Sequence, residues 1–190
     1  MPSMDTSSPL LENYRFLARY NRWFNQSLYA ACEPLSDEER RRERGAFFGS
    51  IQGTLNHLVW ADAMWLGRFA QQGTHFTALA PELLALPAGA SYGTPVCGDF
   101  AALRARRDAM DAAVEAWLAQ MPPEFPLSTM RYSNTKGVVR EHPMWQALTH
   151  FFNHQTHHRG QITTLLMQAG VDPGVTDLIA LVAPPPQAEP

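Results

Sequence analysis

Apolar residues recur at the three-and-four spacing of an α-helix in four long segments of this chain. The first segment begins at Ser8 and Pro9, which suit a helix N-cap and the first helical position. Its apolar stripe continues through Tyr14 and Phe24, and Asn21 interrupts it. A buried asparagine needs a hydrogen-bond partner, so the stripe predicts one for Asn21.

The other three segments differ in how much of the helix surface is apolar. Residues 50–73 are apolar around most of the circumference, which indicates a central position in a helical core. Residues 99–122 carry one apolar stripe and end at a pair of prolines. A proline opens residues 143–170 and a glycine closes them. Between the first two segments, residues 36–43 predict a short charged helix capped by serine.

The connections complete the predicted architecture. Residues 74–98 are rich in proline and glycine and are expected to be a loop. Residues 125–143 place the turn sequence SNTKG between two β-prone runs, which predicts a hairpin before the last long helix. The fold class is therefore all-α, a four-helix bundle in a single domain over residues 1–190. Order is expected over about residues 9–183, followed by a disordered proline-rich tail, 184–190.

Composition and charge narrow the functional classes. The chain is 45% hydrophobic and 17% charged, with a net charge of −3 and Lys136 as its only lysine. No basic face stands out, so no nucleic-acid partner is expected. Cys32 and Cys97 are too few for a disulfide framework and indicate a reducing compartment. Neither a signal peptide nor an apolar run of about 18 residues is present, so we expect a cytoplasmic protein without membrane contact.

The candidate chemistry lies in HFFNHQTHHRGQ, residues 150–161 of the last predicted helix. At about 100° per residue, with His154 at zero, the apolar arc of this helix spans roughly +20° to +120°. His158 falls inside the arc at about +40°, and His154 lies at its edge. His150 and His157 fall on the polar flank, at about −40° and −60°. The pattern predicts that His154 and His158 point toward the bundle interior.

Two neutral imidazoles one helical turn apart can hold one metal ion. The alternative is that His154 and His158 are core histidines, each with a hydrogen-bonded neighbour. The candidate third ligand is His57, the only other histidine in a strongly apolar helix, whereas His75 and His142 are expected at the surface. Three histidines would leave coordination positions open for water or substrate, as in catalytic sites. Such a ligand set suits zinc, nickel, iron or copper.

Other residues near these histidines are not expected to be ligands. Asp62 lies about 140° around the helix from His57, so it is not expected to bind the same ion. One candidate partner for its carboxylate is Arg159. Three large side chains of the second helix are expected to pack the core: Trp60, Met64 and Trp65.

Several stretches together resemble the DinB/YfiT-like superfamily of bacterial metal-binding four-helix bundles: YNRWFNQSLY, GSIQGTLNHLVWADAMWLGRF, HFFNHQTHHRGQITTLLMQAGVDP and TDLI. The resemblance covers nearly the whole chain and is weakest over residues 74–125. It implies a metal triad of His57, His154 and His158. It also implies one divalent ion, nickel or zinc ahead of iron or manganese, and a homodimer.

The resemblance leaves two classes of function open. The first is a metal-dependent enzyme acting on a small molecule, either a hydrolase or a transferase of low-molecular-weight thiols. The second is a non-catalytic, metal-dependent module that binds a small ligand, as in a stress response. No glutamate occurs in an H-E-x-x-H arrangement, which disfavours a metalloprotease and leaves the catalytic residues unassigned.

Overall fold

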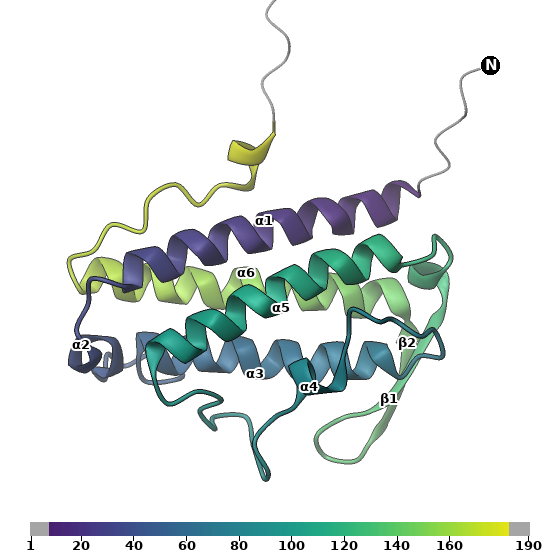
Figure 1. The fold of residues 1–190 in the computed structure, drawn as a ribbon, viewed down its shortest axis with the longest axis horizontal. Helices are drawn as coiled ribbons and strands as arrows, with labels where there is room; N and C mark the ends of the chain where they lie inside the picture. The colour runs from purple at the N-terminus through teal and green to yellow at the C-terminus, as the bar shows by residue number, and fades with distance from the viewer. Residues whose placement is uncertain (1–7, 183–190) are drawn as a thin grey trace, which may run out of the picture.

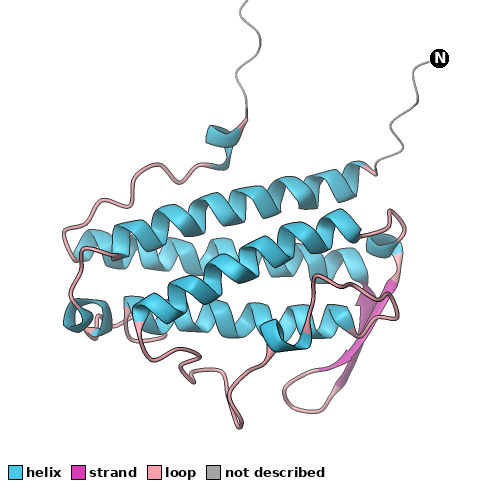
Figure 2. Cartoon of the chain, in the orientation of Figure 1, coloured by secondary structure: helices cyan, strands magenta, loops and turns pink. Residues whose placement is uncertain are grey.

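The computed structural model describes residues 8–182 and confirms the predicted all-α bundle with a small hairpin (Figures 1 and 2). The predicted tail, residues 184–190, lies outside the described residues. The four long helices are α1 (Pro9–Cys32), α3 (Ile51–Ala70), α5 (Phe100–Gln120) and α6 (Met144–Gln168). The shorter elements are α2 (Asp37–Arg41), α4 (Pro81–Leu84), β1 (Thr129–Ser133), β2 (Val139–Pro143) and 3₁₀ turns at Phe125–Leu127 and Leu178–Leu181.

Each long helix packs against two others. Both α1 and α3 contact α5 and α6, so α1 and α3 lie diagonally across the bundle. Figure 1 shows that α3 and α5 run in the same direction, which requires the chain between them to return along the bundle. Residues 71–99 make this return, and α4 lies within them, in a stretch predicted to be loop throughout. No helix among residues 8–182 is both long and apolar enough to cross a membrane.

Side-chain caps start the helices where the sequence predicts. The Ser50 hydroxyl accepts a hydrogen bond from the Gly53 amide at 3.0 Å at the start of α3. The Asp99 carboxylate accepts one from the Ala102 amide at 2.8 Å at the start of α5. Ser8 stands at the N-cap position of α1 but makes no side-chain cap bond.

The predicted hairpin is present and is attached to the end of α3. Asn134 shapes its turn by accepting hydrogen bonds from the amides of Lys136 and Val138, at 2.9 and 3.0 Å. The side chain of Gln72, just beyond α3, donates to the Arg131 carbonyl and accepts from the Arg131 amide, both at 3.1 Å. These paired bonds hold β1 beside the C-terminal end of α3.

Buried polar and charged side chains from all four long helices contact one another in the bundle core. Arg107 of α5 donates to Asp62 at 2.6 Å and lies 2.8 Å from Asp111. The predicted pairing of Asp62 with Arg159 is therefore wrong, because Arg107 reaches the carboxylate first from the neighbouring helix. Arg159 instead donates to the side chain of Asn21, which supplies the partner that the polar break in the first stripe requires. Two further amide side chains complete the network: Asn25 and Gln155.

Candidate metal centre

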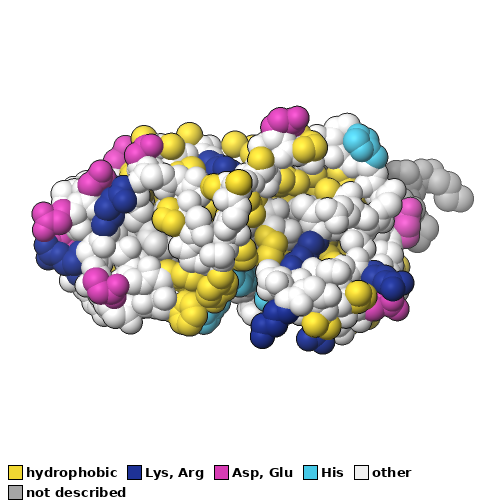
Figure 3. Space-filling view, turned by 90° about the horizontal axis from the view of Figure 1, so that it is seen from below, with side chains coloured by type: hydrophobic (Ala, Val, Ile, Leu, Met, Phe, Trp, Pro, Cys, Tyr) yellow, Lys and Arg dark blue, Asp and Glu magenta, His cyan; other side chains and the backbone are white. Residues whose placement is uncertain are grey.

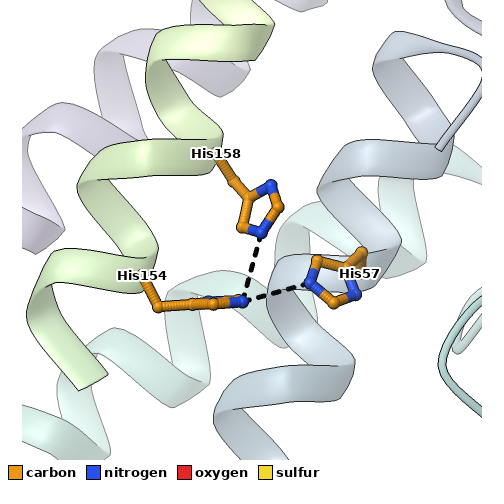
Figure 4. Close-up of side chains that lie close together, drawn as sticks. All are labelled: His57, His154 and His158. Carbon is orange, nitrogen blue, oxygen red and sulfur yellow. Dashed lines mark hydrogen bonds between the residues drawn. The ribbon is translucent and has the colours of Figure 1, made fainter. Parts of the chain in front are cut away.

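Three histidines from two adjacent helices converge on one point. His57 comes from α3, and His154 and His158 come from α6 (Figure 4). The Nε2 atom of His154 lies 3.2 Å from Nε2 of His57 and 3.1 Å from Nε2 of His158. One ring nitrogen from each side chain can be chosen so that all three lie within 4.8 Å of one another. The structure thus brings together the three residues that the sequence singled out.

These separations match the ligand spacing around a single ion. Nitrogens bound at about 2.05 Å to one ion lie roughly 2.9 Å apart at a right angle and roughly 3.3 Å apart at the tetrahedral angle. The two observed nitrogen–nitrogen distances, 3.1 and 3.2 Å, fall between these values. Each of the two pairs that include His154 therefore has the spacing of two ligands on one transition-metal ion.

The hydrogen bonds of Nδ1 in His57 and His158 show which ring nitrogen of each imidazole carries the proton. Nδ1 of His57 lies 3.3 Å from the Tyr92 carbonyl, which can only accept, so Nδ1 carries the proton. Nδ1 of His158 lies 2.8 Å from Oε1 of Gln161, whose amide nitrogen lies 3.2 Å from His157. Both Nε2 atoms then present lone pairs toward His154. A metal-binding histidine is typically oriented by a hydrogen bond of this kind from its other nitrogen.

Burial keeps the triad neutral at neutral pH. Desolvation, together with the nearby His158, lowers the pKa of His57 to about 4. Desolvation and the neighbouring histidines lower the pKa of His154 to about 3. The pKa of His158 is also lowered, mainly by desolvation. Neutral imidazole is the form that binds a metal ion, so protons compete little for this site near pH 7.

Aromatic rings enclose His57. The Phe48 ring stacks on the imidazole with centroids 3.8 Å apart, and Tyr92 meets it edge-on at 5.0 Å. Trp60, one turn along α3, stacks at 6.0 Å. His57 is 3% exposed and His158 6%, whereas His154 is only half-buried. The triad is therefore reached from the side of His154.

A buried asparagine holds the return loop against this site. The Asn56 side-chain oxygen accepts hydrogen bonds from the amides of Val96 and Cys97, at 2.7 and 2.9 Å. These bonds fix the loop segment that carries Tyr92 to the helix that carries His57. Sequence reasoning missed the contribution of Tyr92, because a loop has no periodicity. The available signal was Asn56 itself, a polar residue in a strongly apolar helix that needs partners.

A cavity of about 290 Å³ opens beside the triad. Side chains from α3, α6, the return loop and the hairpin line it, including Trp60, Met64, Trp65, Tyr92, Tyr132 and His150. Figure 3 shows histidine side chains in a recess between a hydrophobic patch and several Lys and Arg side chains. The prediction that Trp60, Met64 and Trp65 pack the core is incomplete, since these side chains also form a wall of the cavity.

The remaining histidines stay outside the triad. His150 is exposed, with its ring centroid 5.8 Å from that of His154, and lines the cavity. His157 is exposed and contacts Gln161. His75 is exposed, as expected, whereas His142 is half-buried because its ring packs against Tyr132, with centroids 5.6 Å apart. The helical positions of His150 and His157 agree with the predicted polar flank.

Comparison with known proteins identifies relatives. The model of the DinB family matches residues 7–187. A curated protein from Bacillus subtilis (strain 168), named Protein DinB, is 25% identical over 162 residues, which cover 85% of this chain and 88% of that relative. No solved structure matches the chain at a significant level.

Proposed function

This chain belongs to the DinB family, and on that basis we propose that it is a metal-dependent enzyme that transfers small thiols to electrophiles. One divalent ion, nickel or zinc, is bound by His57, His154 and His158. The observation that carries the proposal is the convergence of three Nε2 atoms, with neighbours 3.1 and 3.2 Å apart. Without a cation, a single proton on His154 can satisfy only one of the two lone pairs that face it.

The lining of the cavity favours thiol transfer over hydrolysis. A divalent ion supplies Lewis acidity that lowers the pKa of a water or thiol entering its coordination sphere. Hydrolysis at such a site generally uses a carboxylate as general base, as in the H-E-x-x-H proteases. Among residues 8–182, no carboxylate lines the cavity. A thiol depends less on a general base for its deprotonation, because its own pKa is far below that of water.

The chain's own residues have separate tasks in this scheme. Gln161 and the Tyr92 carbonyl orient two of the imidazoles, and Phe48 and Trp60 keep bulk water from His57. The cavity binds the substrate next to His154, the most accessible triad member. In the transfer, the thiol releases its proton to solvent, and its sulfur forms a bond to the electrophilic carbon. The leaving group departs with the bonding electron pair.

A turnover screen tests this proposal. Zinc- and nickel-loaded protein is assayed with a panel of small thiols plus chlorodinitrobenzene, and in parallel with nitrophenyl esters and amides. We expect metal-dependent formation of the thiol conjugate that is lost with a chelator and in His154→Ala, and that persists in His157→Ala. Ester or amide cleavage without thiol transfer would instead establish a hydrolase. Binding of small ligands at the ion without any turnover would establish the non-catalytic alternative.

A further inference from the structure

The cavity beside the triad is elongated along α3. Its α3 wall consists of residues that follow the i, i+3, i+4, i+7 pattern of one helix face: His57, Trp60, Ala61, Met64, Trp65 and Arg68. His57 stands at one end of this face and Arg68 at the other. Between these two polar ends the wall is apolar. A ligand that fills this cavity therefore meets the triad at one end and a guanidinium at the other, with His150 of α6 packed against Trp65 between them.

Arg68 is held in place without a counter-ion. Its guanidinium carbon lies 4.8 Å from the Trp65 ring centroid and 4.6 Å from that of Tyr132, so two aromatic rings position it. Within the described part of the chain, its guanidinium donates a single hydrogen bond, a long one of 3.5 Å, to the Ser133 carbonyl. Among residues 8–182, no carboxylate lies within ion-pair distance of Arg68.

Several other arginines of the bundle have the ion pair that Arg68 lacks. Arg15, Arg22 and Arg104 each contact a carboxylate, at 2.6, 2.6 and 2.5 Å. Arg68 has the same five donors and keeps almost all of them free inside a cavity. A planar guanidinium that is held by aromatic rings and has free donors suits bidentate binding of a carboxylate.

Positively charged residues surround the end of the cavity at which Arg68 lies. The hairpin next to Arg68 carries Arg131, Lys136 and Arg140 against a single carboxylate, Glu141, although the whole chain has a net charge of −3. In Figure 3, Lys and Arg side chains gather beside the recess that contains the histidines. Such a local excess of positive charge attracts anions to the cavity.

We propose that Arg68 forms an anion subsite, and that the ligand is an elongated small molecule with a carboxylate at one end. The carboxylate binds Arg68, an apolar middle lies along Trp60 and Trp65, and the other end reaches the ion held by the triad. The inference rests on the metal site of the proposed function and adds the chemical class of the ligand. It assigns to Arg68 a role in specificity rather than in metal binding.

Helix geometry sets the length of this ligand. His57 and Arg68 are separated by 11 positions. At about 1.5 Å per residue, their Cα atoms are roughly 16 Å apart along the axis. Both side chains point back toward the N-terminus, and the longer arginine reaches slightly further toward the triad. Contacts of about 2 Å to the ion and about 3 Å to the guanidinium leave roughly 10 Å for the ligand itself. A medium-length carboxylate chain with a metal-binding head group matches this span.

Isothermal titration calorimetry on zinc-loaded protein tests the subsite with two probes of similar length. Suberic acid monohydroxamate has a metal-binding hydroxamate and a distal carboxylate, whereas octanohydroxamate has the same head group and an uncharged end. We expect the carboxylate probe to bind about tenfold more tightly to the wild type, as for a charge-assisted pair. In Arg68→Gln, the two probes should bind within about twofold of each other. Arg68→Lys, which keeps the charge but loses the fork, should fall between.

Matched controls separate the subsite from general effects. Arg19→Gln removes one positive charge from α1, a helix that contributes no residue to this cavity, and should keep the tenfold preference. Equal binding of both probes by wild-type protein, or a preference that survives in Arg68→Gln, would overturn the subsite and leave the metal site intact. Loss of octanohydroxamate binding in Arg68→Gln would also overturn it, because Arg68 would then support the triad itself. A wild-type protein that takes up no ion contradicts the proposed function and this inference together.

Discussion

His57 and His158 each donate one ring N–H to an oxygen that is fixed in place, and both direct Nε2 toward His154. The acceptors differ in origin: one is a backbone carbonyl of the return loop, and the other is the side chain of Gln161 on the same helix. Because Nδ1 of each imidazole is hydrogen-bonded, neither ring can flip without losing that bond. This preorganisation lowers the cost of binding an ion.

At the residue scale, the lowered pKa values predict how stability depends on pH in metal-free protein. The pKa values of His57 and His154, about 4 and about 3, lie below the ordinary value of 6.5. Between these limits the unfolded state binds more protons, so the free energy of unfolding falls as the pH drops below about 6.5. We expect urea unfolding of chelator-treated protein to show a lower midpoint at about pH 5 than at about pH 7.

His154→Gln is the matched control for this pH dependence. The variant lacks the most strongly shifted of these groups, so its midpoint should change less between the two pH values. A wild-type midpoint that is the same at both pH values would contradict the lowered pKa values. A variant that retains the full wild-type change would show that other groups cause it.

Sequence periodicity predicted the triad but not the groups that orient it. The helical wheel separated His154 and His158 from His150 and His157, because burial follows the apolar arc of a helix. It also placed His154 at the edge of that arc, where the structure finds it half-buried. Tyr92 could not be predicted, since its position depends on a tertiary contact of Asn56 with the loop rather than on any local pattern.

At the element scale, the tight entry into α3 places Phe48 against His57. A Cβ added to Gly53 would lie only 2.1 Å from the Phe48 carbonyl oxygen, so any other residue there must move this backbone. We expect Gly53→Ala to lower the free energy of unfolding by roughly 1–3 kcal/mol, as overpacking does, measured by urea denaturation. It should also weaken metal binding, because the Phe48 ring shifts on His57.

Gly67 provides a matched control on the same helix. No heavy atom lies within 4 Å of a Cβ added there. Gly67→Ala should therefore raise the free energy of unfolding by roughly 0.5–1 kcal/mol through helix propensity alone. If Gly53→Ala proves as stable as Gly67→Ala, the close approach of Phe48 to α3 is not a structural constraint.

The two buried ion pairs of Arg107, one to α3 and one within α5, give a second prediction at this scale. Arg107→Met leaves the carboxylates of Asp62 and Asp111 buried without their cation. We expect a loss of roughly 3–5 kcal/mol in the free energy of unfolding by urea denaturation. Arg104→Met, which removes a more exposed pair with Glu33 from the same helix, should cost about 0–1 kcal/mol. Similar losses in both variants would argue against the importance of the buried network.

The elements themselves were predictable to different degrees. The four long helices and the hairpin carry strong periodic and turn signals, and the structure confirms them. The four residues of α4 are too few to show a helical period within the proline-rich loop. The predicted partner of Asp62 was wrong because more than one buried arginine could pair with its carboxylate. The sequence does not show which of these arginines lies on the nearest helix.

At the scale of the whole molecule, the parallel course of α3 and α5 produces the long return loop, and the loop then forms one wall of the cavity. The bundle thus provides the candidate metal ligands on α3 and α6, while the connections supply Tyr92 and Tyr132 to the lining of the cavity. The predicted homodimer stays a prediction, because the structure describes a single chain.

The central claim is that one divalent ion binds at His57, His154 and His158. Elemental analysis of untagged protein tests it most directly. We expect about one ion per chain in the wild type and in His157→Ala, and a large loss of metal in both His57→Ala and His154→Ala. A wild-type protein without bound metal, or full metal content in both ligand variants, would contradict the claim.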